Sequence, residues 1–162
     1  MNVLYQELVA RIRGEVSDLE RVVERALQAW VHTQEPSEAQ QAYLDSVALN
    51  LHALYSGIER LFELIARHVD RSLPTSTTWH HDLLQQMAKD RPDVRPPVIS
   101  HDTVRPLDEF RRFRHLVRNV YAIDLVPERM TGLMAALPEL WPNLRAEMLA
   151  FADFLEELAQ VG

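Results

Sequence analysis

Apolar residues recur at every third or fourth position over most of this chain, and this spacing is the strongest constraint on its fold. Within residues 2–33 the run is Leu4, Leu8, Ile12, Val16, Leu19, Val23, Leu27 and Trp30. Within residues 36–69 it is Leu44, Val47, Leu51, Leu54, Ile58, Leu61, Phe62 and Ile65. Such spacing predicts helices that bury one face. Pro36 separates the two runs and fits a helix start, so we expect an antiparallel hairpin of two long helices.

The rest of the chain continues the helical pattern, and no segment alternates as a strand would. We expect a short helix over 79–89, followed by an ordered loop over 91–100 in which Val98 and Ile99 are buried. A helix over 103–125 comes next, and Pro127 begins another helix. Pro138 and Pro142 are expected to interrupt the chain before a last helix over 143–160. The prediction is an all-α, up-and-down bundle of four main helices plus short ones, with residues 1–162 forming a single domain.

Composition excludes several classes of protein. The net charge of −7 argues against a protein that coats nucleic acid through bulk positive charge. The absence of cysteine excludes disulfides and thiolate metal sites, and it fits a cytoplasmic protein. No apolar run approaches the roughly 20 residues of a membrane span, and the N-terminal segment lacks the pattern of a signal peptide. We therefore expect no membrane association.

One segment concentrates positive charge and unusual side chains. Residues 105–118 carry five arginines against two acidic residues. On a helix, Arg114, Arg118 and Tyr121 share one face, and His115 lies one turn before Asn119. Arginine can bind phosphate through two parallel hydrogen bonds, and histidine can transfer a proton near neutral pH. The segment is suited to holding and cleaving a phosphodiester.

This segment resembles the motif of the HEPN superfamily and, within it, of the HepT-like ribonuclease toxins. Their pattern is Arg, a polar residue, three residues, His, one residue and Tyr. Arg114, His115 and Tyr121 match it, whereas Asn119 stands where the family has His. Three further blocks are similar to such relatives, in a resemblance that spans residues 40–158: Leu44–His52, Tyr55–Arg60 and Trp79–Leu84.

The resemblance implies a homodimeric endoribonuclease toxin that needs no metal and no cofactor. It implies an antitoxin of the MNT nucleotidyltransferase type, which can silence the toxin by transferring AMP to Tyr121. It also implies an RNA substrate, with transfer RNA among the targets. Because the dimer brings two motif helices together, the implied site is composite.

Metal-free RNA cleavage needs proton transfer and positive charge on the developing phosphorane. Arg114 is the expected charge-stabilising residue, with Arg118 and Arg111 as phosphate contacts. Asn119 does not titrate near neutral pH, so within the site it can only orient phosphate or water. His115 is the first candidate for the proton-transferring role.

More distant candidates for that role are His80 and His81. A metal site at this pair is disfavoured, because adjacent residues point to different faces of a helix. Glu59 and Glu63 are candidates for buried counter-ions of the arginine-rich helix.

Two other interpretations remain open. In one, Asn119 marks lost chemistry and the chain is a non-catalytic helical partner of a nucleotidyltransferase. In the other, the bundle is a general interaction module, and Arg114, His115 and Arg118 form a solvated face.

Overall fold

The computed structural model describes residues 2–119 and 127–161, and these residues form an all-α bundle, as predicted. The long helices are α1 (Val3–Thr33), α2 (Gln40–Ile65), α4 (His101–Asn119) and α5 (Pro127–Val161). The short elements are a π-helical turn, η1 (Ala66–Asp70), which continues α2, and α3 (Trp79–Met87). None of the described helices is both long and apolar enough to cross a membrane.

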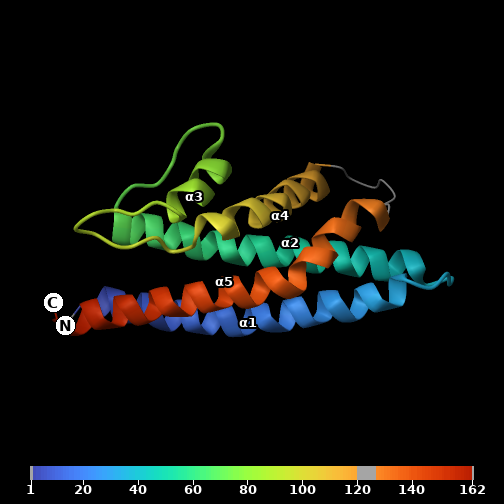
Figure 1. Cartoon of the computed structure of the whole chain (residues 1–162), viewed down its shortest axis with the longest axis horizontal. Coiled ribbons are helices and arrows are strands. Elements are labelled where there is room, and N and C mark those ends of the chain that lie inside the picture. Colours follow the sequence, from blue (N-terminus) through green and yellow to red (C-terminus); the bar gives the residue numbers. More distant parts are fainter. Residues whose placement is uncertain (1, 120–126, 162) are drawn as a thin grey trace.

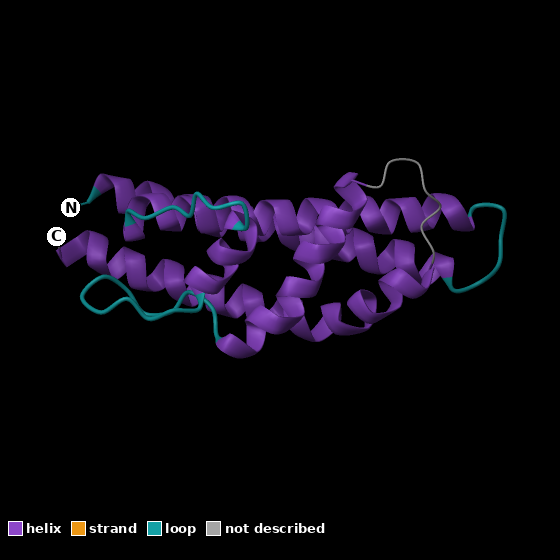
Figure 2. Ribbon diagram, turned by 90° about the horizontal axis from the view of Figure 1, so that it is seen from above, coloured by secondary structure: helices purple, strands orange, loops and turns teal. Residues whose placement is uncertain are grey.

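The long helices run up and down along one axis. Helices α1 and α2 form the expected antiparallel hairpin, and α5 returns beside α1, so that the two ends of the chain meet (Figures 1 and 2). The backbone N–H of Asn2 donates to the carbonyl of Ala159 at 3.0 Å. Helix α4 lies on α2, and α3 sits beside both in the connection between them (Figure 1). This arrangement places α2, α3 and α4 around one point of the bundle.

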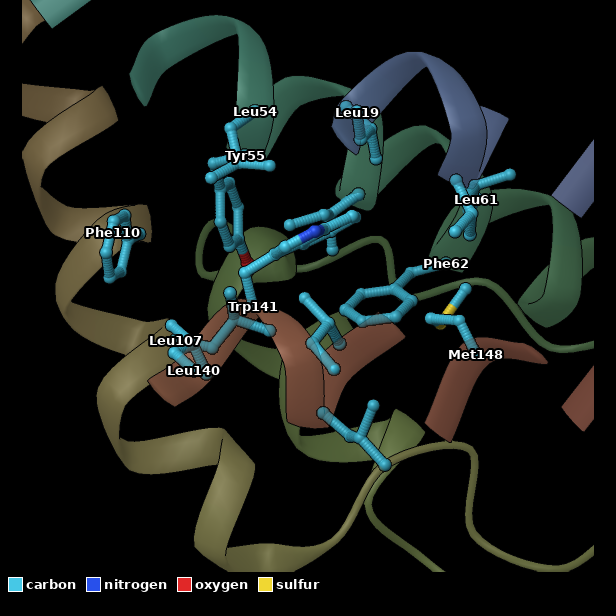
Figure 3. Packing of buried hydrophobic residues seen from close by; sticks show 14 of the residues in the cluster. Leu19, Leu54, Tyr55, Leu61, Phe62, Leu107, Phe110, Leu140, Trp141 and Met148 are labelled. Carbon is cyan, nitrogen blue, oxygen red and sulfur yellow. The ribbon is translucent and has the colours of Figure 1, made fainter. Parts of the chain in front are cut away.

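The core is a continuous apolar cluster along the inner faces of the helices. Phe62 of α2 packs near Trp141 and Met148 of α5, and Leu107 and Phe110 bring α4 into the same cluster (Figure 3). The indole N–H of Trp141 reaches the surface side of the core and donates to Glu20 of α1.

The prediction for the C-terminal part was wrong in one respect, because Pro138 and Pro142 do not interrupt the helix there. Both lie inside α5, which is continuous over 35 residues. A proline removes one backbone hydrogen bond and bends a helix, and the axis of α5 bends in this stretch (Figure 1). Leu137, Leu140 and Trp141 are buried there, so tertiary packing holds the helix through the bend. The start of α2 was also predicted too early, since residues 36–39 belong to the connector.

The segment between α3 and α4 is an ordered loop, as its prolines predicted. Val98 and Ile99 are buried, and their N–H groups both bond to the carbonyl of Met87. Arg95 adds an anchor that the sequence did not reveal: its guanidinium is fully buried and forms two hydrogen bonds, of 2.6 and 2.8 Å, with Asp70. The loop after α3 is therefore anchored to Asp70, the last residue of η1.

Gly57 allows α1 and α2 to approach closely. A Cβ atom built at this position would lie 2.7 Å from Cδ2 of Leu19 and 3.0 Å from Oε1 of Glu15. Gly14, in the middle of α1, offers a matched contrast, because a Cβ atom there meets nothing within 4 Å.

We predict that Gly57→Ala lowers the free energy of unfolding by about 1 kcal/mol, since overpacking a tight contact outweighs the gain in helix propensity. Gly14→Ala should raise the same quantity by about 0.5–1 kcal/mol, because only the propensity gain applies. Urea unfolding of the two variants and the wild type measures both effects. Equal stabilisation by the two substitutions would show that the helices do not meet closely at Gly57.

Candidate functional site

The centre of the site is a buried ion pair between α2 and α4. Arg114 Nη1 donates to Glu59 Oε1 at 2.9 Å, and Arg114 Nη2 donates to Glu59 Oε2 at 3.2 Å. The two side chains are only 10% and 6% exposed. Two parallel hydrogen bonds of this kind fix the plane of the guanidinium as well as its position. Glu59 is thus the counter-ion that the sequence analysis proposed for the arginine-rich helix, and Arg114 does not lie on a solvated face.

His80 of α3 completes this arrangement. Its Nδ1 lies 2.8 Å from Glu59 Oε2 and 3.0 Å from Arg114 Nη2. The indole of Trp79 stacks on the imidazole, with 3.5 Å between ring centroids. We call Tyr55, Glu59, His80 and Arg114 the charge cluster.

Tyr55 is the fully buried member of the charge cluster. It lies one turn before Glu59 on α2, and its ring centroid is 5.1 Å from Cζ of Arg114, a cation–π distance. Burial raises the pKa of the Tyr55 phenol well above its ordinary value, and the nearby charge of Glu59 raises it further. Tyr55 Oη and Arg114 Nε are the buried side-chain polar atoms of the described residues that lack a hydrogen-bond partner.

The first turn of α3, which carries His80, is bonded to the polar segment that precedes it. The hydroxyls of Ser76 and Thr78 both donate to Oδ2 of Asp82, at 2.6 and 3.1 Å. The hydroxyl of Ser76 contributes most to lowering the pKa of Asp82. These side-chain bonds tie residues 76–78, directly before α3, to Asp82 in the first turn of that helix.

The other predicted site residues lie at different places. Arg111 forms an ion pair with Asp108 on its own helix, with Nε 2.6 Å from Oδ1. His115 is exposed and lines a shallow groove with Leu116 of α4 and Leu133 of α5, away from the face that Arg114 buries. The side chain of His81 is 44% exposed, and its Nδ1 lies 3.8 Å from Oδ1 of Asp82.

The side chains of Arg118 and Asn119, and Tyr121 as a whole, lie outside the described residues. Their roles as phosphate contact, motif residue and modification target stay predictions.

A wide surface groove lies elsewhere, between the start of α4 and α5, and carries Asp102, Glu139 and Glu147. The carboxylate of Glu147 already accepts bonds there from the Ser100 N–H and the Thr103 hydroxyl. An acidic groove of this kind does not suit a phosphodiester. In the described ranges, no group of three or more histidine and acidic side chains is placed to hold a metal ion.

Comparison with known proteins gave one finding. Residues 46–155 match a family model described as HepT-like protein, over a range that contains α3, α4 and the whole charge cluster. Neither the curated proteins nor the solved structures gave a significant match.

We predict that Arg114→Met lowers the free energy of unfolding by about 3–5 kcal/mol, because the buried carboxylate of Glu59 loses its arginine partner and keeps only its contact with His80. The double variant Glu59→Met with Arg114→Met should recover most of that loss, since an apolar pair of similar volume fills the same space. A double-mutant cycle by urea unfolding tests the pair. Arg112→Met is the control: Arg112 is 65% exposed on the same helix, and its loss should cost less than about 1 kcal/mol. Additive losses from the two single variants would contradict the pairing.

A second prediction concerns Tyr55 at high pH. Its folded-state pKa is raised, so its contribution to stability is present below the unfolded-state value of about 10 and is lost as pH rises above it. Tyr55→Phe removes this dependence. The difference in unfolding free energy between wild type and Tyr55→Phe should therefore shift against the wild type between about pH 9 and pH 11. A constant difference across that range would show that the phenol is not buried in its neutral form.

Proposed function

This chain belongs to the HepT-like family, and from that premise we propose that it is a metal-independent endoribonuclease toxin of a HEPN/MNT toxin–antitoxin pair. In this proposal the protein is a cytoplasmic homodimer that cleaves RNA, with transfer RNA among its substrates. A nucleotidyltransferase antitoxin of the MNT type silences it by modifying Tyr121.

The observation that carries the proposal is the state of Arg114. The arginine at the family's motif position is buried against Glu59, His80 and Tyr55, and its Nε donor is unsatisfied. A buried ion pair of this kind adds little stability compared with apolar residues of similar volume. Buried polar atoms without a partner are also rare in folded proteins and call for an explanation. A catalytic role explains both features, because positive charge that is already in place can stabilise a phosphorane transition state without reorganisation.

In this proposal, the charge cluster and the motif residues have separate tasks. Arg114 supplies positive charge at a fixed place, and Glu59 fixes it there. Arg118 is proposed to contact the phosphate from the same helix. Asn119 cannot transfer a proton, so the reaction requires a histidine from elsewhere, either His115 or His80.

One alternative is favoured by a specific observation. Both terminal nitrogens of Arg114 are engaged by Glu59, and Asn119 replaces the motif histidine. A chain with this combination would serve as a non-catalytic partner of a nucleotidyltransferase, with the charge cluster as a structural feature. The alternative predicts a stable complex with such an enzyme and no cleavage of RNA.

The decisive experiment is cleavage of total tRNA in EDTA by wild type, Arg114→Lys and Arg112→Lys. Lysine keeps the charge of Arg114 but loses the paired hydrogen bonds. We expect cleavage by the wild type, a loss of about 100-fold or more in Arg114→Lys, and unchanged cleavage in Arg112→Lys. Circular dichroism must show that all three are folded, and mass spectrometry that Tyr121 is unmodified.

Three outcomes would contradict the ribonuclease. They are no cleavage by folded, unmodified wild type, cleavage that requires a divalent ion, and cleavage that is insensitive to Arg114→Lys. The first outcome, together with a stable complex with a nucleotidyltransferase, would establish the non-catalytic partner instead.

A further inference from the structure

We propose that His80 is the proton-transferring residue of this ribonuclease and takes the role that Asn119 cannot perform. The inference rests on the proposed function and adds a catalytic residue that lies on α3 and not on the motif helix. Its basis is the contact of the His80 Nδ1 atom with Glu59 and Arg114, together with the partial exposure of the His80 side chain.

Three neighbours from three helices hold the His80 ring. Glu59 of α2 lies at Nδ1, 2.8 Å away, and Arg114 of α4 lies beside the same nitrogen at 3.0 Å. Trp79, from α3 itself, covers one face of the ring. A catalytic base is most effective when its rotamer is locked by such packing and hydrogen bonds.

The contact with Glu59 determines which nitrogen carries the proton. A carboxylate only accepts hydrogen bonds, so the 2.8 Å contact places a proton on Nδ1, which donates to Oε2. Arg114 Nη2 carries hydrogens as well, and it donates to the same oxygen of Glu59, Oε2. With the proton on Nδ1, His80 and Arg114 therefore both donate to Glu59. Nε2 of neutral His80 then carries the lone pair, which is the tautomer that a general base requires.

The side chain of His80 is partly open to solvent. It is 26% exposed, while Nδ1 faces Glu59 and Arg114. The two ring nitrogens lie on different edges of the imidazole, so a ring held at Nδ1 can present Nε2 to an RNA hydroxyl that approaches from the exposed side.

His115 does not offer this combination. It follows Arg114 directly in the chain, so a rotation of about 100° separates the two side chains on the helix. Its surroundings are the exposed groove toward α5, whereas Arg114 points into the bundle. A base and a charge-stabilising residue must serve the same phosphate, and the structure places His80, 3.0 Å from Arg114, in that relation.

The reaction step that follows is internal transesterification. His80 Nε2 takes the proton from the 2′-hydroxyl, and the 2′-oxygen forms a bond to phosphorus. The bond from phosphorus to the 5′-oxygen breaks, and that oxygen takes a proton from water. The products are a 2′,3′-cyclic phosphate and a free 5′-hydroxyl, and imidazolium returns its proton to solvent.

The test compares His80→Asn with the wild type in the metal-free tRNA assay. The amide of asparagine overlays Nδ1 and can still donate to Glu59, but it has no group at the position of Nε2. We expect a loss of about 100-fold or more in cleavage rate with little change in melting temperature. His101→Asn, at the exposed start of α4, is the matched control and should cleave at the wild-type rate.

His80→Ala provides a second measurement that does not depend on the asparagine variant. Imidazole added to this variant should restore cleavage, and more basic substituted imidazoles should restore it faster, as a general base does. A purely structural histidine would give rescue that is independent of basicity. The 2′,3′-cyclic phosphate end is expected in every active reaction.

The outcomes separate the two proposals. If folded, unmodified wild type does not cleave RNA, the proposed function itself fails. If the wild type cleaves while His80→Asn cleaves at a comparable rate, or imidazoles do not rescue His80→Ala, the ribonuclease stands and the role of His80 is overturned.

Discussion

The ion pair between Glu59 and Arg114 is the interaction on which the rest of this structure depends. It joins α2 to α4 across the interior, and through His80 it also fixes α3. A charge removed from water must be paired, so neither residue can be changed alone without leaving the other uncompensated. The site and the packing of three helices therefore rest on the same contact. For this reason, the effect of a substitution at Arg114 on activity is meaningful only beside a measurement of folding.

The neighbourhood of this pair is built to hold it in one geometry. The loop before α4 is anchored by Asp70 and Arg95 at the end of α2, and the start of α3 is fixed by Ser76, Thr78 and Asp82. These contacts involve no residue of the charge cluster, but they lie on both sides of α3, the helix that carries His80. In the proposed ribonuclease, α4 supplies the charge and α3 supplies the base, so the replacement of the motif histidine by Asn119 moves acid–base chemistry from one helix to another.

Much of the fold could be predicted, because amphipathic periodicity is a local property of the sequence. The hairpin of α1 and α2 and the all-α class followed from it, and the loop over residues 91–100 followed from its prolines. The error at Pro138 and Pro142 has a physical cause: the apolar residues between and around the two prolines bury well enough to keep α5 helical despite the missing hydrogen bonds. Local breaking signals were outweighed by tertiary packing, which the pattern of one segment does not contain.

The sequence by itself determined the helices, the concentration of arginine near the end of α4, and the family to which the chain belongs. It also named Glu59, together with Glu63, as a candidate counter-ion of the arginine-rich helix. Only the tertiary structure decided which histidine meets Arg114. Glu59 and Arg114 are 55 residues apart, and His80 and Arg114 are 34 apart. Contacts over such separations depend on how helices cross and how far a loop reaches, and these follow from the packing of the whole core.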